Sequence, residues 1–439
     1  MGRDNCAANP TSNSPLTDTS RFLLVSLNLK AILRESTKYQ RRERLRKITD
    51  RLGSGGAYEA MIERIKAQDG GRSRLGIKAL MWISNAERPL RVDELCHALA
   101  VELGSTSFNA DNVPSMSTVE GCCQGLITVD QEASTVRLIH ITLQEYLFTH
   151  PDIPSRPHSA IAEVCLTYLN SKQVKFLSAD PSPDTRDTPF LEYCSVYWGV
   201  HAKKELSDRT RLLALELLEK YDGHISGKLL LGQARHLFVK DFGISFQFNG
   251  LHCASLFGIV EIAGALIEIG TYGINGGDFV GYTPLAWAAR NGHDEMVKML
   301  LEQEEIDPDK PDNSGQTPLS RAAGGGHKGV VHILLARRGV NPDGPNNYGL
   351  TPLLCAAQNG HEGVVKILLE RGEVNPDKPN RVGVTPLSYA ARCGHEEVVK
   401  ILLRREVNPN KPDNRDQTPL MLAARYGHKR VTALLQPLK

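Results

Sequence analysis

The sequence lacks the short motifs by which most nucleotide, metal and redox sites are recognised. No G-x-x-x-x-G-K-[ST] string occurs, so the amides and the lysine that hold nucleotide phosphates are missing. None of the nine cysteines forms a C-x-x-C pair, which argues against zinc and thioredoxin-type sites. No G-x-S-x-G elbow occurs either. We therefore expect no catalytic residues, no metal and no cofactor, and a protein that is not an enzyme.

Long apolar runs and an excess of one charge are also missing. The 52 basic and 50 acidic side chains give a net charge of +2, which offers no general reason to bind nucleic acid or an anionic membrane. Residues 1–20 hold Pro10, Pro15 and many Ser, Thr and Asn, but no apolar segment of a signal peptide. We expect this N-terminus to be disordered and the protein to be cytoplasmic, with the nucleus as the alternative.

The C-terminal part of the chain repeats itself. Thr-Pro-Leu recurs at intervals of 34, 34, 34 and 33 residues, and it begins at Thr283, Thr317, Thr351, Thr385 and Thr418. A degenerate earlier copy is Asn249-Gly250-Leu251. Each copy continues with small residues, then Gly-His, then an apolar stripe such as Val364 to Leu369. Such a period predicts an array of similar units that bury their apolar faces against one another.

Each repeated residue type has a physical task. The threonine precedes a helix, where its hydroxyl can cap free N–H groups. The proline falls in the first turn, where its missing donor costs nothing. The paired alanines allow two helices to approach closely, and the glycine suits the left-handed residue that ends a helix. The apolar stripe has helical spacing, which predicts a second helix in each unit.

The pattern T-P-L-x-x-A-A-x-x-G-H-x-x-V-V-x-x-L-L resembles the ankyrin repeat family, and we expect six repeats over residues 249–439. The family usually has His after Thr-Pro-Leu, and only His252 in the first copy keeps it. The resemblance implies a helical solenoid that binds a protein ligand on its concave face. Charge is graded along it, with eleven acids and three bases in residues 249–312 but three acids and eight bases in residues 401–439. A partner of complementary polarity would be oriented by this gradient.

The ankyrin resemblance also implies which side chains bind. In the family, the variable contacts lie at the tips of the finger loops and at the end of the first helix of each repeat. By position these residues are Phe279, Val280, Tyr282, Arg290, Asn291, Asn347, Tyr348, Leu350, Gln358, Asn359, Arg381, Val382, Val384, Arg392, Cys393, Asn414, Arg415, Gln417, Arg425 and Tyr426.

The N-terminal half shows a different pattern. Apolar residues predict helices near residues 75–83 and 92–100 and a short third helix at Val119–Cys123, followed by two alternating strands at 126–129 and 136–139. This order is typical of a winged-helix domain with a two-stranded wing. The fold class we expect is mainly α: a small winged-helix domain, a helical connector and a C-terminal ankyrin-repeat solenoid.

Longer strings in this half resemble fungal NACHT-ankyrin proteins of the STAND class, which are similar to NOD-like receptors. The strings are RFLLVSLNLKAILREST, ALMWISNAERPLRVDELCHALAVE, GLITVDQEASTVRLIHITLQEYL, PFLEYCSVYWGVHAK and GLHCASLFGIVEIA. The second and third are similar to the winged helix of GPI inositol-deacylase. The domains we expect are a disordered 1–20, a remnant of the NACHT-associated helices at 21–70, the winged helix at 71–150, a helical connector at 151–248 and the repeats at 249–439.

The resemblance leaves several functions open. The first hypothesis is the recognition part of a NOD-like-receptor-type protein without its ATPase, whether the chain is truly short or a truncated gene product. Its partners would be a protein ligand and a full-length NACHT relative, without nucleic acid or membrane. The alternatives are a free-standing ankyrin adaptor and a winged-helix DNA-binding regulator. The third short helix carries Glu120 and no Arg or Lys, which disfavours DNA binding, and the basic run Lys38–Arg51 is interpreted as an exposed helical face.

Overall fold

The computed structural model describes residues 37–40, 42, 56–150, 156–177, 187–233, 247–405 and 407–436. The expected disordered N-terminus, most of the NACHT-like segment at 21–70 and most of the basic run lie outside these residues. The chain divides into two compact units, the first formed by residues 1–102 and 108–161 and the second by residues 103–107 and 162–439.

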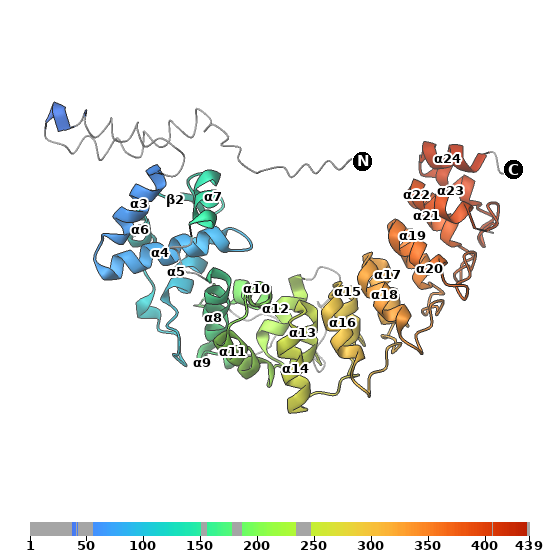
Figure 1. Ribbon diagram of the computed structural model, residues 1–439, viewed down its shortest axis with the longest axis horizontal. Helices are drawn as coiled ribbons and strands as arrows, with labels where there is room; N and C mark the ends of the chain where they lie inside the picture. Colours follow the sequence, from blue (N-terminus) through green and yellow to red (C-terminus); the bar gives the residue numbers. More distant parts are fainter. Residues whose placement is uncertain are drawn as a thin grey trace, which may run out of the picture. The chain divides into compact units, whose positions relative to one another are not determined.

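The described part of the first unit is a small domain of helices with one sheet (Figure 1). Its elements are α3 Gly56–Lys66, α4 Gly70–Asn85, β1 Leu90–Arg91, α5 Val92–Ala100, the 3-10 turn Ala110–Asn112, α6 Met116–Cys122, β2 Ile127–Asp130, β3 Thr135–Leu138 and α7 Ile141–Thr149. Helix α4 packs against α3, α5 and α6, so it forms the centre of this unit. Ala79, Leu80, Met81 and Trp82 on this helix are accordingly buried, Trp82 with 1% exposure.

The sheet has three antiparallel strands in the order β1-β3-β2. The two longer strands are the predicted wing, and Ile127 pairs with Leu138 across it. The short strand β1 adds Leu90 opposite Val136, a third strand that the expected two-stranded wing did not include. A two-residue strand carries no alternation of side chains, so periodicity could not reveal it.

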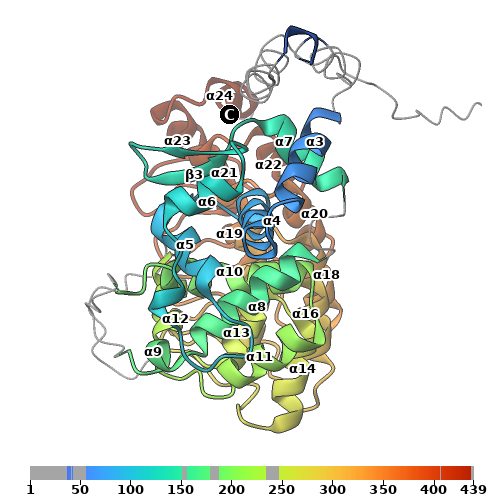
Figure 2. The ribbon, with the colours of Figure 1, turned by 90° about the vertical axis from the view of Figure 1, so that its left-hand side faces the viewer.

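The second unit begins with the connector helices, of which α10 and α11 pack onto the repeat array. They are the end of α8 Pro157–Leu169, α9 Lys172–Lys175, α10 Leu191–Lys204, α11 Asp208–Leu218 and α12 Ile225–Gln233. Figures 1 and 2 show α11 beside α13 and α14, and α10 also contacts α13. Phe257 packs edge-on against Trp198, with ring centroids 5.3 Å apart. The connector is thus continuous with the array and not a separate body.

Six helix pairs follow, and each pair is joined to the next by a loop. The pairs are α13 Gly250–Phe257 with α14 Val260–Ile269, α15 Pro284–Arg290 with α16 Asp294–Leu301, α17 Pro318–Gly325 with α18 Lys328–Ala336, α19 Pro352–Asn359 with α20 Glu362–Leu369, α21 Pro386–Cys393 with α22 Glu396–Leu403, and α23 Pro419–Arg425 with α24 Lys429–Leu435. The odd-numbered helices stack on one another as a first row, and the even-numbered helices stack as a second row.

The repeated residues perform their expected tasks in this array. In the fourth pair, the Thr351 hydroxyl accepts a hydrogen bond from the Leu354 N–H at 3.3 Å, which caps α19. Gly360 ends that helix with a φ of 76°, in the left-handed region. Ala356 and Ala357 are fully buried, which lets the first-row helices stack closely. Burial of the apolar stripe on the second row, such as Val364, joins consecutive pairs into one core.

Candidate protein-binding surface

The loop before each first-row helix from α15 onward is a hairpin-like finger, built on one Asp or Asn side chain. In the second pair, Asp278 accepts backbone hydrogen bonds from Val280 at 3.0 Å and Tyr282 at 2.8 Å. A short carboxylate or amide can satisfy the amides of a tight turn in this way. The residues that start the five fingers are Asp278, Asp312, Asn346, Asn380 and Asp413.

Consecutive fingers are tied together through their backbones. The Asn313 N–H donates to the Val280 carbonyl at 3.1 Å, and the Asn347 N–H donates to the Ser314 carbonyl at 3.0 Å. The Asn414 N–H makes the same bond to the Val382 carbonyl at 3.1 Å. The fingers therefore form one continuous ridge, whose backbone is fixed and whose side chains differ from pair to pair.

The Gly-His histidines are part of the scaffold. His327 Nε2 lies 2.8 Å from the Arg290 carbonyl, and His361 Nε2 lies 2.9 Å from the Gly324 carbonyl. The corresponding bonds hold His293, His395 and His428 to the preceding pair. These contacts between consecutive pairs give the five histidines a structural role.

His252, the one histidine that follows the family's pattern, is also structural. Its ring bonds to the Asn249 N–H at 3.2 Å and to the Gly276 carbonyl at 2.9 Å. Burial lowers the pKa of His252 to about 4, so this ring is neutral at neutral pH. Its two hydrogen bonds fix the first finger-like loop against α13.

Most of the residues predicted to bind are accessible. The exposed ones are Asn291, Asn347, Tyr348, Gln358, Asn359, Arg381, Val382, Arg392, Cys393, Asn414, Arg415, Arg425 and Tyr426. The half-buried ones are Phe279, Val280, Arg290, Leu350 and Gln417. Tyr282 and Val384 are only 4% and 7% exposed, so in this structure they pack the bases of their fingers and offer almost no surface to a partner.

A groove of about 760 Å³ lies on the surface formed by the fingers and first-row helices of the second, third and fourth pairs. We call it the 280–359 groove. Its lining residues are Val280, Tyr282, Arg290, Ser314, Gln316, Ser320, Arg321, Gly324, Gly325, Leu350, Cys355, Gln358 and Asn359. Six of these were predicted from the sequence, and the third pair supplies a further six that were not. The groove brings the predicted residues of the second and fourth pairs to one place.

The missed residues of the third pair had a signal in the sequence. Where the other first-row helices from α15 onward end in side chains such as Arg290-Asn291 and Gln358-Asn359, α17 ends in Gly324-Gly325. Comparing the copies position by position shows the two glycines as a missing pair of side chains. A search for reactive or charged residue types does not detect two missing side chains.

Charge in the groove is organised around Tyr282. The Arg321 guanidinium stacks over the Tyr282 ring, 4.4 Å from its centroid, and pairs with the buried carboxylate of Asp312. Arg290 donates to the Tyr282 hydroxyl at 3.1 Å. Because the Asp312 side chain is 1% exposed, its partner Arg321 serves to compensate a buried charge, and Arg290 is the more available cation.

The finger of the second pair also holds a carboxyl group with a shifted pKa. Burial raises the pKa of Asp278 to about 6, against the opposing effect of its hydrogen bonds from Tyr282 and Trp287. The Trp287 indole N–H donates to this carboxylate at 3.0 Å. The charge of Asp312, which starts the next finger, raises this pKa further. All of these neighbours belong to adjacent packed repeats, so the shift reflects folding of the array.

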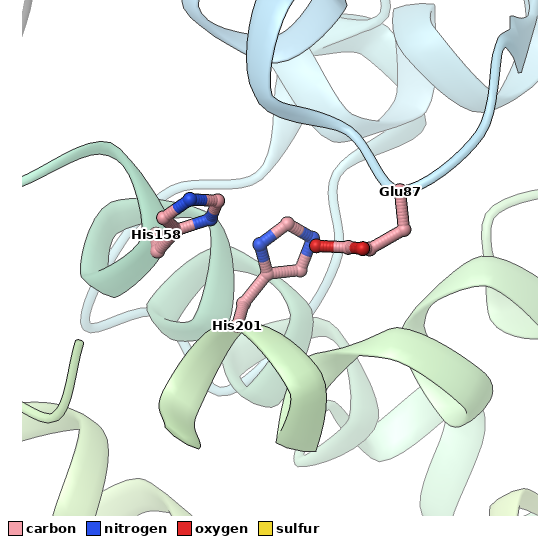
Figure 3. A group of neighbouring side chains, drawn as sticks. All are labelled: Glu87, His158 and His201. Atoms are coloured by element: carbon pink, nitrogen blue, oxygen red, sulfur yellow. The ribbon is translucent and has the colours of Figure 1, made fainter. Parts of the chain in front are cut away.

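Within the described part of the first unit, the helix that precedes the wing carries no basic side chain. Helix α6, which precedes the wing, has the sequence MSTVEGC without Arg or Lys. Figure 3 shows Glu87, His158 and His201, three side chains of a type that can ligate metals. Glu87 and His158 belong to the first unit and His201 to the second, where it bonds to the Tyr193 hydroxyl at 2.9 Å. We assign no metal site to them.

Comparison with known families agrees with this architecture. Residues 221–312, 304–380 and 372–438 match the family described as ankyrin repeats (3 copies). Residues 62–156 match the family described as GPI inositol-deacylase, winged helix domain. A comparison with curated proteins found no match. The chain therefore carries a winged-helix domain of the GPI inositol-deacylase type followed by ankyrin repeats.

Ankyrin repeats are interaction modules, and their presence implies a protein partner. Within the described residues, no helix has the length and apolar character needed to cross a membrane.

Proposed function

We propose that this chain is the recognition and connector part of a NOD-like-receptor-type protein, which binds a protein ligand on the ankyrin surface. The observation that carries the proposal is the 280–359 groove, where three consecutive repeats present fixed fingers with variable side chains. A rigid backbone that displays different side chains is well suited to selective binding, because little order is lost on association.

The surface carries side chains of the kind that stabilise protein complexes. Tyr348, Val382 and Tyr426 are 65%, 57% and 48% exposed, and Arg392 stacks over Tyr426 at 5.3 Å from the ring centroid. Exposed aromatic and arginine side chains are the residues that most often dominate binding energy. The proposed ligand covers these fingers together with the groove.

We further propose that these 439 residues do not hydrolyse ATP. The receptor class that the winged helix and repeats resemble signals through a nucleotide-driven switch, and the sequence given lacks the phosphate-binding string that such a switch requires. Calorimetry with Mg-ATP tests this directly: no heat of binding is expected, and micromolar affinity would refute the proposal.

Comparative affinity capture tests the proposed binding. The whole chain and a variant with R392A, Y426A and Y348A are used as baits in parallel. A variant of the second row, with K298A and K366A, is the matched control, because both lysines are exposed and lie away from the fingers. Proteins held by wild type and control but released by the finger variant support the proposal. An identical set on all three baits would reject it.

A further inference from the structure

The 280–359 groove is open beside Gly324 near the end of α17, a glycine that neither its backbone nor its packing requires. The neighbouring Gly325 differs, because a Cβ there would lie 2.5 Å from His327 Nε2. Gly324 does not adopt the left-handed conformation, unlike Gly326 with a φ of 77°. A Cβ at Gly324 would lie 3.8 Å from both Cys355 Cβ and Asn359 Nδ2, which is ordinary van der Waals contact. Since glycine is less favourable than alanine within a helix, this glycine costs stability. Its structural effect is the space in the groove.

The groove is cationic on one side and holds no acid. None of its lining residues is Asp or Glu. The Arg321 guanidinium is matched by Asp312, whereas Arg290 is half-buried and bonds only to the neutral hydroxyl of Tyr282 among the described residues. A partly desolvated guanidinium without a carboxylate partner favours an incoming carboxylate.

A buried donor in the finger of the fourth pair lacks a hydrogen-bond partner. In three fingers, the side chain of the starting Asp or Asn bonds to the residue nine positions later, as Asn380 does to the Tyr389 hydroxyl at 3.2 Å. In the finger of the fourth pair that later residue is Cys355, which lines the groove, and the Nδ2 of Asn346 has no hydrogen-bond partner. Asn346 is only 4% exposed, so this is a buried amide that an acceptor would stabilise.

We propose that the 280–359 groove binds an extended peptide segment of the partner, with an Asp or Glu side chain seated at Arg290 above Gly324. This inference rests on the proposed function, and it names the chemistry of the ligand. The amides of Gln316, Gln358 and Asn359 present donors and acceptors together, as a peptide backbone requires. A polyanion such as nucleic acid fits less well, because it would need several unmatched cations and the groove has one.

A displayed library of random twelve-residue peptides, panned on the whole chain, tests the proposal. Gly324→Gln fills the groove while it keeps, and by helix propensity strengthens, α17. Gly264→Gln on α14 is the matched control, because a Cβ there meets open space and the helix lies in the second row. Urea midpoints of both variants confirm that they remain folded.

We expect enriched peptides to carry Asp or Glu, and their affinity to fall at least about tenfold on G324Q, and on Arg290→Met, but not on G264Q. Exchanging the peptide's Asp or Glu for Asn or Gln should cause a similar loss. Peptides that bind G324Q as well as wild type would overturn the inference. So would enriched peptides without acids, the absence of any enriched peptide, or stronger binding of a single-stranded oligonucleotide than of every peptide.

Failure here is distinguishable from failure of the proposed function. If the finger variant loses its captured proteins but G324Q retains them all, the ankyrin surface binds a partner and the groove does not take part. If neither variant changes the captured set, the proposed function itself is refuted.

Discussion

Alanine substitutions at Gly324 and Gly326 should change the free energy of unfolding in opposite directions. Gly324 is within α17 and has room for a Cβ, so Gly324→Ala should raise the free energy of unfolding by about 0.5–1 kcal/mol. Gly326 has a φ of 77°, and a Cβ there would lie 2.6 Å from Nδ1 of His361. The left-handed conformation alone costs a side chain about 1–2 kcal/mol.

The histidine adds to the cost at Gly326. To make room, the His361 ring must leave the Gly324 carbonyl, to which its Nε2 bonds at 2.9 Å. A lost hydrogen bond of this kind is worth about 1 kcal/mol. Gly326→Ala should therefore lower the free energy of unfolding by about 2–3 kcal/mol.

Urea unfolding followed by far-ultraviolet circular dichroism measures both changes, with wild type and the two variants at one pH. Equal slopes against urea show that the midpoints can be compared as stabilities. The reasoning fails if Gly324→Ala lowers the midpoint or if Gly326→Ala leaves it unchanged, because then the backbone angles and the room at each Cβ do not control the outcome.

Three further predictions follow from buried charges and thiols. The folded pKa of Asp278 is raised to about 6 from 3.8, so the folded chain binds this proton more tightly than the unfolded chain. The stability that this proton contributes is fully present below the unfolded pKa and is lost as the pH rises towards 6. Urea midpoints should therefore fall over this pH range in wild type but not in Asp278→Asn. Arg321→Met leaves the Asp312 carboxylate buried and unpaired and should cost about 3–5 kcal/mol in urea unfolding, a loss that Asp312→Asn in the same chain should partly restore. Among the cysteines of the described residues, Cys393 is the exposed one, so mass spectrometry should find it alkylated by iodoacetamide before Cys355, whose pKa burial raises to about 11; equal rates would contradict the assigned burial.

The sequence predicted the array well because every pair repeats one solution to the same local problem. Thr351 must cap a helix and Gly360 must end it, and these needs recur at a fixed spacing that does not depend on distant contacts. The short strand β1 was missed for the opposite reason. Leu90 becomes part of a strand only by pairing with Val136, 46 positions along the chain.

The candidate surface was predicted less completely. Transferring the family's contact positions to this sequence identified Arg290 and Gln358, which line the groove, because those contacts fall at fixed places in the repeat. It also included Tyr282, which packs against Trp287 and Arg321 at the base of its finger. Burial of that kind depends on which large side chain the neighbouring repeat supplies, and no single repeat contains this information. The twenty predicted contacts remain predictions as binding residues.

The packing of α10 and α11 onto α13 and α14 has a practical consequence for anyone who wishes to isolate the repeats. Cutting the chain at residue 249, where the repetition begins, would remove Trp198 from its contact with Phe257 and expose the parts of α13 and α14 that α10 and α11 cover. Such a fragment would expose an apolar surface at its N-terminal end and would tend to self-associate. The connector covers the N-terminal end of the repeat array, so any shortened protein should start before Leu191.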